Sequence, residues 1–273
     1  MAELRPMYMS DLNTVVKIIE ATDEDDAEEA REIYQEYGVE GQFVLEHDNK
    51  IIGVIGYSEV PGTDGTYWLS WTYLDPAFQG LGMGKQMLND LLNMLREKNG
   101  RKIFVKVSDY DDPEDGRVYE RAMKLYESVG FVEELVGKDF YDEGENQHIY
   151  GLKLRDAASD EEDEVEIADE KPVIRFDGMY EIGDSDGAYT FSWTVKDNKG
   201  LFEKRNFTVE DLRLGIDAVR NEGGRKIFLT FPSNLPLIHT PLQAAGFKFV
   251  GRLTDYYEKG VHELHFTHDL GNG

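Results

Sequence analysis

The spacing of hydrophobic residues in the first 155 positions predicts alternating strands and helices. Apolar residues recur at intervals of three and four after Ser10, which is placed to cap a helix. The same spacing predicts four helical segments, at Leu12–Ile19, Asp26–Tyr37, Met87–Leu95 and Val118–Val129. Runs typical of strands lie around them, at 3–5, 42–47, 51–60, 66–74, 102–107, 132–136 and 148–154. This alternation is typical of an α/β (α+β) domain.

An acidic run interrupts the pattern at 156–171 and is followed by Pro172. Like charges repel one another, and the run offers little apolar surface to bury, so it predicts a linker at 156–172. The linker divides the chain into a first domain at 1–155 and a second at 173–273. Both lengths lie within the usual range of a single domain.

The two halves share three sequence segments in the same order. Gly65–Thr72 recurs as Gly187–Thr194, and both segments end in Ser-Trp-Thr. Gly-Arg-Lys-Ile-Phe and Gly-Phe also occur in both halves, starting at Gly100 and Gly224 and at Gly130 and Gly246. Three ordered matches favour a duplicated unit. The second copy is smaller, because it lacks a counterpart of about the first fifty residues.

The composition narrows the set of partners. The 273 residues include 55 Asp and Glu against 29 Lys and Arg, a formal net charge of -26. This charge disfavours nucleic acid and anionic membranes and favours small molecules or cationic amines and peptides, although solubility alone also accounts for it. The absence of cysteine excludes disulfides, thiolate catalysis and a cysteine-based zinc site. With no apolar leader and no membrane-spanning run, we expect a cytoplasmic protein.

A glycine-rich loop, Gln79-Gly80-Leu81-Gly82-Met83-Gly84, separates the strand predicted at 66–74 from a helix. Backbone N–H groups and the helix dipole at such a start attract phosphate, and glycine lets the anion approach. A P-loop would need Gly at 79 and Ser or Thr at 86, but glutamine occupies both positions. A Rossmann fingerprint would need Gly at 85 or 87, which are Lys and Met. A turn that only starts the helix is the remaining simple alternative.

Two motifs together resemble the GNAT family of N-acetyltransferases. Gln79, Gly82 and Gly84 fit Gln-x-x-Gly-x-Gly, and residues 122–131 fit Ala-x-x-x-Tyr-Glu-x-x-Gly-Phe. The resemblance covers about residues 3–154 and implies a mixed central sheet flanked by helices. It further implies that acetyl-CoA, or a related acyl-CoA, is the cosubstrate, that no metal is needed, and that the acyl group passes to an amine of a small molecule or peptide.

The resemblance also implies roles for particular residues. The backbone N–H groups of the glycine loop would hold the CoA pyrophosphate, and N–H groups near Tyr73 and Leu74 would face the thioester carbonyl as an oxyanion site. Tyr126 would protonate the departing thiolate, with core packing as its alternative role. The residues implied for the cofactor are therefore Tyr73, Leu74, Gln79, Gly80, Leu81, Gly82, Met83, Gly84 and Lys85.

The general base is less well defined, because the strand at 67–73 has no glutamate where many family members carry one. Glu59 is the first candidate, with a surface carboxylate as its alternative, and Glu46 is the second. Tyr119 occupies the place of an asparagine that often contacts CoA. The acidic segment at 23–29 could attract a cationic amine or simply favour a helix start.

The second half lacks both motifs. The counterpart of the glycine loop, 197–207, has a single glycine, and Leu242 stands where the first half has Tyr126. Three prolines interrupt the counterpart of the tyrosine helix. We therefore expect a degenerate GNAT-like copy without a CoA site. The histidines at 239, 262, 265 and 268 fit surface positions better than a metal site.

Two other functions remain open at this point. The missing glutamate and the eroded second copy also fit a non-catalytic acyl-CoA-binding or protein-interaction module. A tandem enzyme resembling mycothiol synthase is less favoured, because there the C-terminal copy carries the chemistry. The sequence leaves the acceptor, the acyl chain and a homodimer undetermined.

Overall fold

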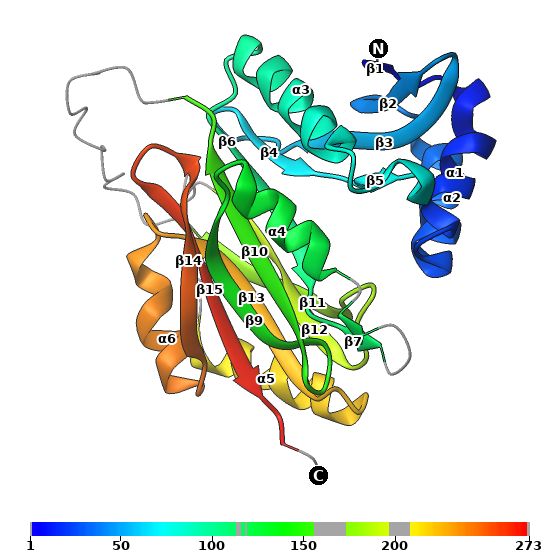
Figure 1. Cartoon of the computed structure of the whole chain (residues 1–273). Helices are drawn as coiled ribbons and strands as arrows, with labels where there is room; N and C mark the ends of the chain where they lie inside the picture. Colours follow the sequence, from blue (N-terminus) through cyan, green and yellow to red (C-terminus); the bar gives the residue numbers. More distant parts are fainter. Residues whose placement is uncertain (1, 113–115, 118, 156–172, 197–207, 272–273) are drawn as a thin grey trace. The chain divides into compact units, whose positions relative to one another are not determined.

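A computed structural model describes residues 2–112, 116–117, 119–155, 173–196 and 208–271 (Figure 1). Contacts between Cα atoms divide them into two compact units. The first unit comprises 2–106, 120–132 and 150–155, and the second comprises the other described residues. The predicted linker at 156–172 and the predicted loop counterpart at 197–207 lie outside the described residues.

The first sheet is mixed, with the order β1-β2-β3-β4-β6-β10-β9 and β5 paired to β3 beside this path. Strands β1 to β4 are antiparallel neighbours, whereas β4 and β6 are parallel. The strands are β1 (Ala2–Pro6), β2 (Gln42–His47), β3 (Lys50–Glu59), β4 (Thr66–Leu69), β5 (Tyr73–Leu74), β6 (Lys102–Ser108), β9 (Val132–Asp142) and β10 (Glu145–Lys153). A separate small hairpin pairs β7 (Asp111–Asp112) with β8 (Gly116–Arg117).

Helices cover both faces of this sheet, as Figure 1 shows for α3 on one side and α1 and α2 on the other. Helices α1 (Leu12–Glu20) and α2 (Glu24–Tyr37) bury their apolar faces in one core with Val54 of β3. Helix α3 (Met83–Glu97) packs the side chain of Met87 onto Gly53 of β3. Successive residues of a strand point to opposite faces, so both faces of the sheet carry side chains that a helix can cover. The apolar residues of each helix lie on one side, and that side packs on the sheet.

Two local predictions need correction. Ser10 does not cap α1, because it lies inside a 3-10 helix, Met9–Asp11, that precedes α1. The carboxylate of Asp11 accepts the hydrogen bond of the Tyr8 N–H at 2.9 Å there.

The strands predicted at 132–136 and 148–154 are longer in the structure, where they are β9 and β10 and form one hairpin. At its turn, the Gly144 N–H donates to the carboxylate of Asp139, a residue in the left-handed conformation.

The strand predicted at 66–74 is interrupted. Strand β4 ends at Leu69, opposite Tyr57, and β5 resumes at Tyr73, opposite Val54. Three residues, 70–72, therefore face only two residues of β3, which is the arrangement of a β-bulge. Strand β4 pairs with β6 over three positions, Thr66–Trp68, whereas β5 pairs with β3. The strand thus pairs with β6 only through β4, and the residues of β5, which the glycine loop contacts through Gln79, no longer pair with β6.

The second sheet has the order β11-β12-β13-β15-β14. Strands β12 and β13 are parallel, and the other neighbours are antiparallel. Its elements are β11 (Val173–Glu181), β12 (Ala188–Lys196), α5 (Val209–Asn221), β13 (Lys226–Pro232), a 3-10 helix (Pro236–Ile238), α6 (His239–Ala244), β14 (Lys248–Glu258) and β15 (Val261–Asp269). Helix α6 is short but continuous, because Pro241 lies in its first turn, where proline is tolerated; the predicted interruption by Pro241 is therefore wrong. Helix α4 of the first unit (Glu120–Ser128) is longer.

The sequence matches between the halves coincide with matching backbone hydrogen bonds. The Arg101 N–H donates to the Gly65 carbonyl at 2.8 Å, and the Arg225 N–H donates to the Gly187 carbonyl at 2.8 Å. Further corresponding pairs are Gly100 to Leu95 and Gly224 to Val219, Phe131 to Tyr126 and Phe247 to Leu242, and Leu154 to Arg101 and Leu270 to Arg225. The order β3-β4-β6-β10-β9 in one sheet corresponds to β11-β12-β13-β15-β14 in the other.

Gly100 and Gly224 follow the ends of α3 and α5, and we predict that neither tolerates alanine. A Cβ at Gly100 would lie 2.8 Å from the Leu95 carbonyl oxygen, and one at Gly224 would lie 2.4 Å from a Val219 methyl carbon. Each alanine should lower the free energy of unfolding by about 1–3 kcal/mol, measured by urea denaturation. Gly183→Ala is the control, because nothing lies within 4 Å of its Cβ. Equal stability of all three variants would contradict the packing at these helix ends.

Candidate active site

The glycine loop turns through two left-handed residues and leads directly into α3. Gly80 and Gly82 have φ values of +74° and +81°, and Gly82 is the N-cap of the helix. A Cβ at either position would meet no heavy atom within 4 Å, so the conformation, not crowding, requires glycine there. The Gln86 N–H is bonded back to the Gly82 carbonyl at 3.0 Å, and the N–H groups before it begin the helix. The predicted loop-to-helix arrangement is confirmed.

Side chains attach this loop to its surroundings. The Gln79 amide donates to the Leu74 carbonyl at 3.1 Å, which joins the loop to β5. Arg121 of α4 donates to the side-chain oxygen of Gln79 at 3.5 Å, and the Lys85 ammonium donates to the Ser128 backbone carbonyl at 3.1 Å. The Gln79 side chain thus connects the end of β5 to α4. Its position in the motif has a structural explanation that the sequence did not show.

The β-bulge at 70–72 is held by a buried polar contact. The Gln42 side-chain oxygen accepts hydrogen bonds from the Ser70 hydroxyl at 2.9 Å and from the Tyr34 hydroxyl at 3.2 Å. Gly56 lies directly below this contact, since a Cβ there would come within 2.1 Å of the Gln42 oxygen. Trp71, inside the bulge, packs edge-on against Tyr34 with ring centroids 5.4 Å apart. The site of the bulge is therefore specified by residues distant in sequence.

Tyr126 extends from α4 to this bulge. Its side chain is buried and packs against Phe131, with the two ring centroids 5.6 Å apart. Burial raises the pKa of Tyr126 to about 12, and the nearby Thr72 side chain acts in the opposite direction. The phenol is consequently protonated at neutral pH, as a proton donor must be.

The N-terminus of α2 contacts the other end of the interruption. The Asp26 carboxylate accepts a hydrogen bond from the Tyr73 hydroxyl, while the Asp23 carboxylate caps α2 by accepting the Asp26 N–H at 3.0 Å. The capping role expected for part of the acidic segment is thus present at Asp23. Asp26 instead joins α2 to the first residue of β5.

Comparison with known proteins identifies this arrangement. The model of the acetyltransferase (GNAT) family matches residues 8–131. This segment is a GNAT acetyltransferase domain. A crystal structure from Desulfovibrio desulfuricans, described as an acetyltransferase of the GNAT family, is 27% identical and covers 57% of this chain and 100% of its own, with a TM-score of 0.51.

Two more distant solved structures accompany it. A ribosomal-protein-S18-alanine N-acetyltransferase from Escherichia coli is 20% identical, covering 59% of this chain and 98% of its own, with a TM-score of 0.46. An acetyltransferase from Salmonella typhimurium, solved with its cofactor acetyl-CoA, is 17% identical over 59% and 98%, with a TM-score of 0.45. No curated protein matches the chain.

The residues predicted for the cofactor come together within the GNAT domain, whereas the predicted bases do not join them. Glu59 lies opposite Tyr67, three residues along β3 from Gly56, and is exposed. That spacing puts it about 10 Å from the bulge, on the side away from β5. Glu46 is hydrogen-bonded to Arg5 at 2.8 Å. A carboxylate on the strand at 67–73 remains absent, so these positions leave the base unassigned.

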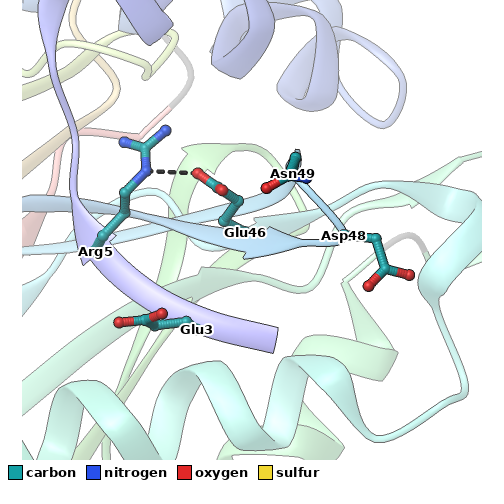
Figure 2. Close-up of a pocket in the computed structure, with 5 residues that line it drawn as sticks. All are labelled: Glu3, Arg5, Glu46, Asp48 and Asn49. Carbon is teal, nitrogen blue, oxygen red and sulfur yellow. Dashed lines mark hydrogen bonds and ion pairs between the residues drawn. The ribbon is translucent and has the colours of Figure 1, made fainter. Parts of the chain in front are cut away.

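A surface cavity lies elsewhere in the GNAT domain. Figure 2 shows Arg5 and Glu46 pointing toward one another, with the other lining residues at β1 and the turn between β2 and β3. The cavity of about 380 Å³ is lined by Glu3, Arg5, Glu46, Asp48 and Asn49. Arg5 also pairs with Asp11 at 2.8 Å, so its charge is compensated within the protein. None of the residues of the glycine loop lines this cavity.

Two general features bear on the remaining expectations. Within the described ranges, no cluster of three or more His, Asp or Glu side chains could hold a metal ion. The histidines of the second unit make separate contacts: His262 accepts from the Asp255 N–H at 2.9 Å, and His265 bonds Glu263 at 3.0 Å. No helix in the described part of the chain is long and apolar enough to cross a membrane.

The pKa of Tyr126 predicts an alkaline loss of stability. A phenol raised from 10 to about 12 stabilises the folded state fully below pH 10, and the contribution is lost between pH 10 and 12. By pH 11 the wild type should lose about 1.4 kcal/mol more stability than Tyr126→Phe, measured by urea unfolding at successive pH values. Parallel pH profiles of the two proteins would contradict the burial of this phenol.

Proposed function

We propose that the chain is an acetyl-CoA-dependent N-acetyltransferase that acts on a primary amine of a small molecule or peptide. One observation carries the proposal: the GNAT family model matches residues 8–131, and within that segment the glycine loop is hydrogen-bonded through Gln79 to α4, the helix that carries Tyr126. The loop offers backbone N–H groups to an anion, and the phenol offers a proton. The net charge of -26 supports a cationic acceptor.

The cofactor would lie between the loop and the bulge. Gln79, Gly80, Leu81, Gly82, Met83, Gly84 and Lys85 would hold the pyrophosphate, with Gly84 and Lys85 in the first turn of α3. The pantetheine arm would follow the parting of β5 from β6, as the family resemblance implies. Backbone N–H groups near Tyr73 and Leu74 would then stabilise the oxyanion that forms on the thioester carbonyl.

The reaction requires little chemistry from side chains. A neutral amine would attack the thioester carbonyl and form a tetrahedral intermediate, whose nitrogen gives a proton to water before the C–S bond breaks and leaves the amide and the CoA thiolate. Tyr126 would give its proton to the sulfur, so that the thiol leaves, and would then recover a proton from solvent. Since Glu59 lies along β3 away from the bulge, the proposal assigns the first deprotonation of the ammonium group to water.

Residues 173–273 would be a degenerate copy of the GNAT domain without a CoA site. The corresponding strand order and the matching backbone hydrogen bonds support a common origin. Leu242 stands at the position of Tyr126 and is buried, so it supplies no proton. On this proposal residues 1–155 form the active domain, residues 156–172 the linker and residues 173–273 the degenerate copy.

Gly84→Asp separates cofactor binding from folding. The nearest heavy atom to a Cβ at Gly84 is 3.7 Å away, and a carboxylate in the first turn of a helix is favourable. Stability should therefore be retained, while the new charge repels pyrophosphate and weakens CoA binding by about 30-fold or more in calorimetric titration. Gly183→Asp, in the second unit, is the matched control and should bind CoA as the wild type does.

Turnover is then measured as thiol release from acetyl-CoA with a panel of primary amines. Wild type and Gly183→Asp should be active, and Gly84→Asp and Tyr126→Phe should lose activity by about 100-fold. Undiminished CoA binding by Gly84→Asp would contradict the loop as the cofactor site. CoA binding by the wild type without turnover of any amine would instead favour a non-catalytic acyl-CoA-binding module.

A further inference from the structure

The β9–β10 hairpin contacts residues 173–273 inside the second unit. The guanidinium of Arg225 donates to the backbone carbonyls of Asp139 and Phe140, to the second at 3.2 Å. The ammonium group of Lys226, a buried residue, lies 3.2 Å from the Asp139 carboxylate. The ring of Phe140 packs against Phe228, with the two centroids 4.9 Å apart. Because β9 is the last strand of its sheet, these contacts cover an edge strand.

A second contact joins β9 to β14, the last strand of the other sheet. The Glu134 carboxylate accepts a hydrogen bond from the Thr254 N–H at 2.7 Å. Leu135 lies over Gly251, where a Cβ would come 2.8 Å from a Leu135 methyl carbon. The Gly-Phe match aligns the two copies from position 130 to 246, an offset of 116, which also takes 135 to 251. Leu135 therefore contacts its own counterpart, as residues at a twofold axis do.

The two hairpins have the same turn geometry at this offset. Asp139 and Asp255 have φ values of +51° and +54°, and their carboxylates accept the N–H groups of Gly144 and Gly260, each at 3.0 Å. The N–H of each aspartate donates to the side chain seven residues later at 2.9 Å. The donor segment Gly-Arg-Lys-Ile-Phe also occurs twice, starting at 100 and 224. Each copy thus carries both a donor segment and an acceptor hairpin, the composition of a self-complementary interface.

We propose that residues 173–273 act as a built-in subunit, which covers the β9–β10 hairpin of the same chain as a second chain would in an isologous dimer. The covered surface also includes the Tyr141 carbonyl, which accepts the Asp186 N–H at 2.7 Å. Covalent attachment gives this occupant a higher effective concentration at the hairpin than a separate chain has. The role needs no CoA site, and the proposal does not depend on the enzymatic activity.

The mass of the chain in solution is the first measurement. Because the hairpin is already covered from within the chain, light scattering during gel filtration should give the mass of one chain at all concentrations. The mass of two chains would overturn the proposal, since the hairpin contact would then be open to a partner chain.

An engineered disulfide shows which chain supplies the contact, because the natural chain has no cysteine. A Cβ at Gly251 would lie 3.9 Å from Leu135 Cγ, so Leu135→Cys with Gly251→Cys should form a disulfide on mild oxidation. The product should run as one chain on a non-reducing gel. Leu135→Cys with Gly183→Cys is the matched control and should form no disulfide within a chain, because nothing lies within 4 Å of a Cβ at Gly183. A disulfide between two chains, or none, in the first pair would overturn the proposal.

Arg225→Ala tests the donor segment in the background of the first cysteine pair. Loss of the guanidinium should slow disulfide formation about 10-fold, because its hydrogen bonds no longer hold the hairpin. Arg213→Ala, at an exposed position of α5, is the control and should leave the rate within about 2-fold. Urea denaturation of the reduced proteins shows that each variant is folded. An unchanged rate in folded Arg225→Ala would overturn the proposal.

Discussion

The site depends on one constraint, the three-against-two mismatch that interrupts the strand from β4 to β5. The mismatch persists because Gly56 leaves room for the Gln42 side chain, which accepts the hydroxyls of Ser70 and Tyr34. In a continuous strand, residues 70–72 would pair regularly with β3, and the pairing of β4 with β6 could continue into β5. An interruption beside a functional site is the usual place for a bulge.

The interrupted strand and its neighbours hold the glycine loop and helix α4 in fixed positions. The carbonyl of Leu74, the last residue of β5, accepts a hydrogen bond from the Gln79 side-chain amide of the glycine loop. Arg121 and Lys85 connect the loop to α4, the helix that carries Tyr126. The proposed pyrophosphate loop and the proposed proton donor are thus joined by side-chain hydrogen bonds.

The sequence predicted the helices and the loop well because those depend on local patterns. The spacing of Met87, Leu91 and Leu95 and the glycines before them suffice to place α3. The interruption at 70–72 was missed because its cause lies in Gln42 and Gly56, and alternation of side chains continues through it. Glu59 was the first candidate for the base because it ends the strand before the one that lacks a glutamate, whereas the pairing of β3 puts it away from the bulge.

A crystal structure of the chain with acetyl-CoA tests the central claim most directly. The account predicts pyrophosphate density against the backbone N–H groups of Gly80–Lys85, with the thioester carbonyl near Tyr73 and Leu74 and the sulfur near the Tyr126 hydroxyl. It predicts no second cofactor among residues 173–273. Cofactor density there, or at a place among residues 1–155 away from the glycine loop, would contradict it.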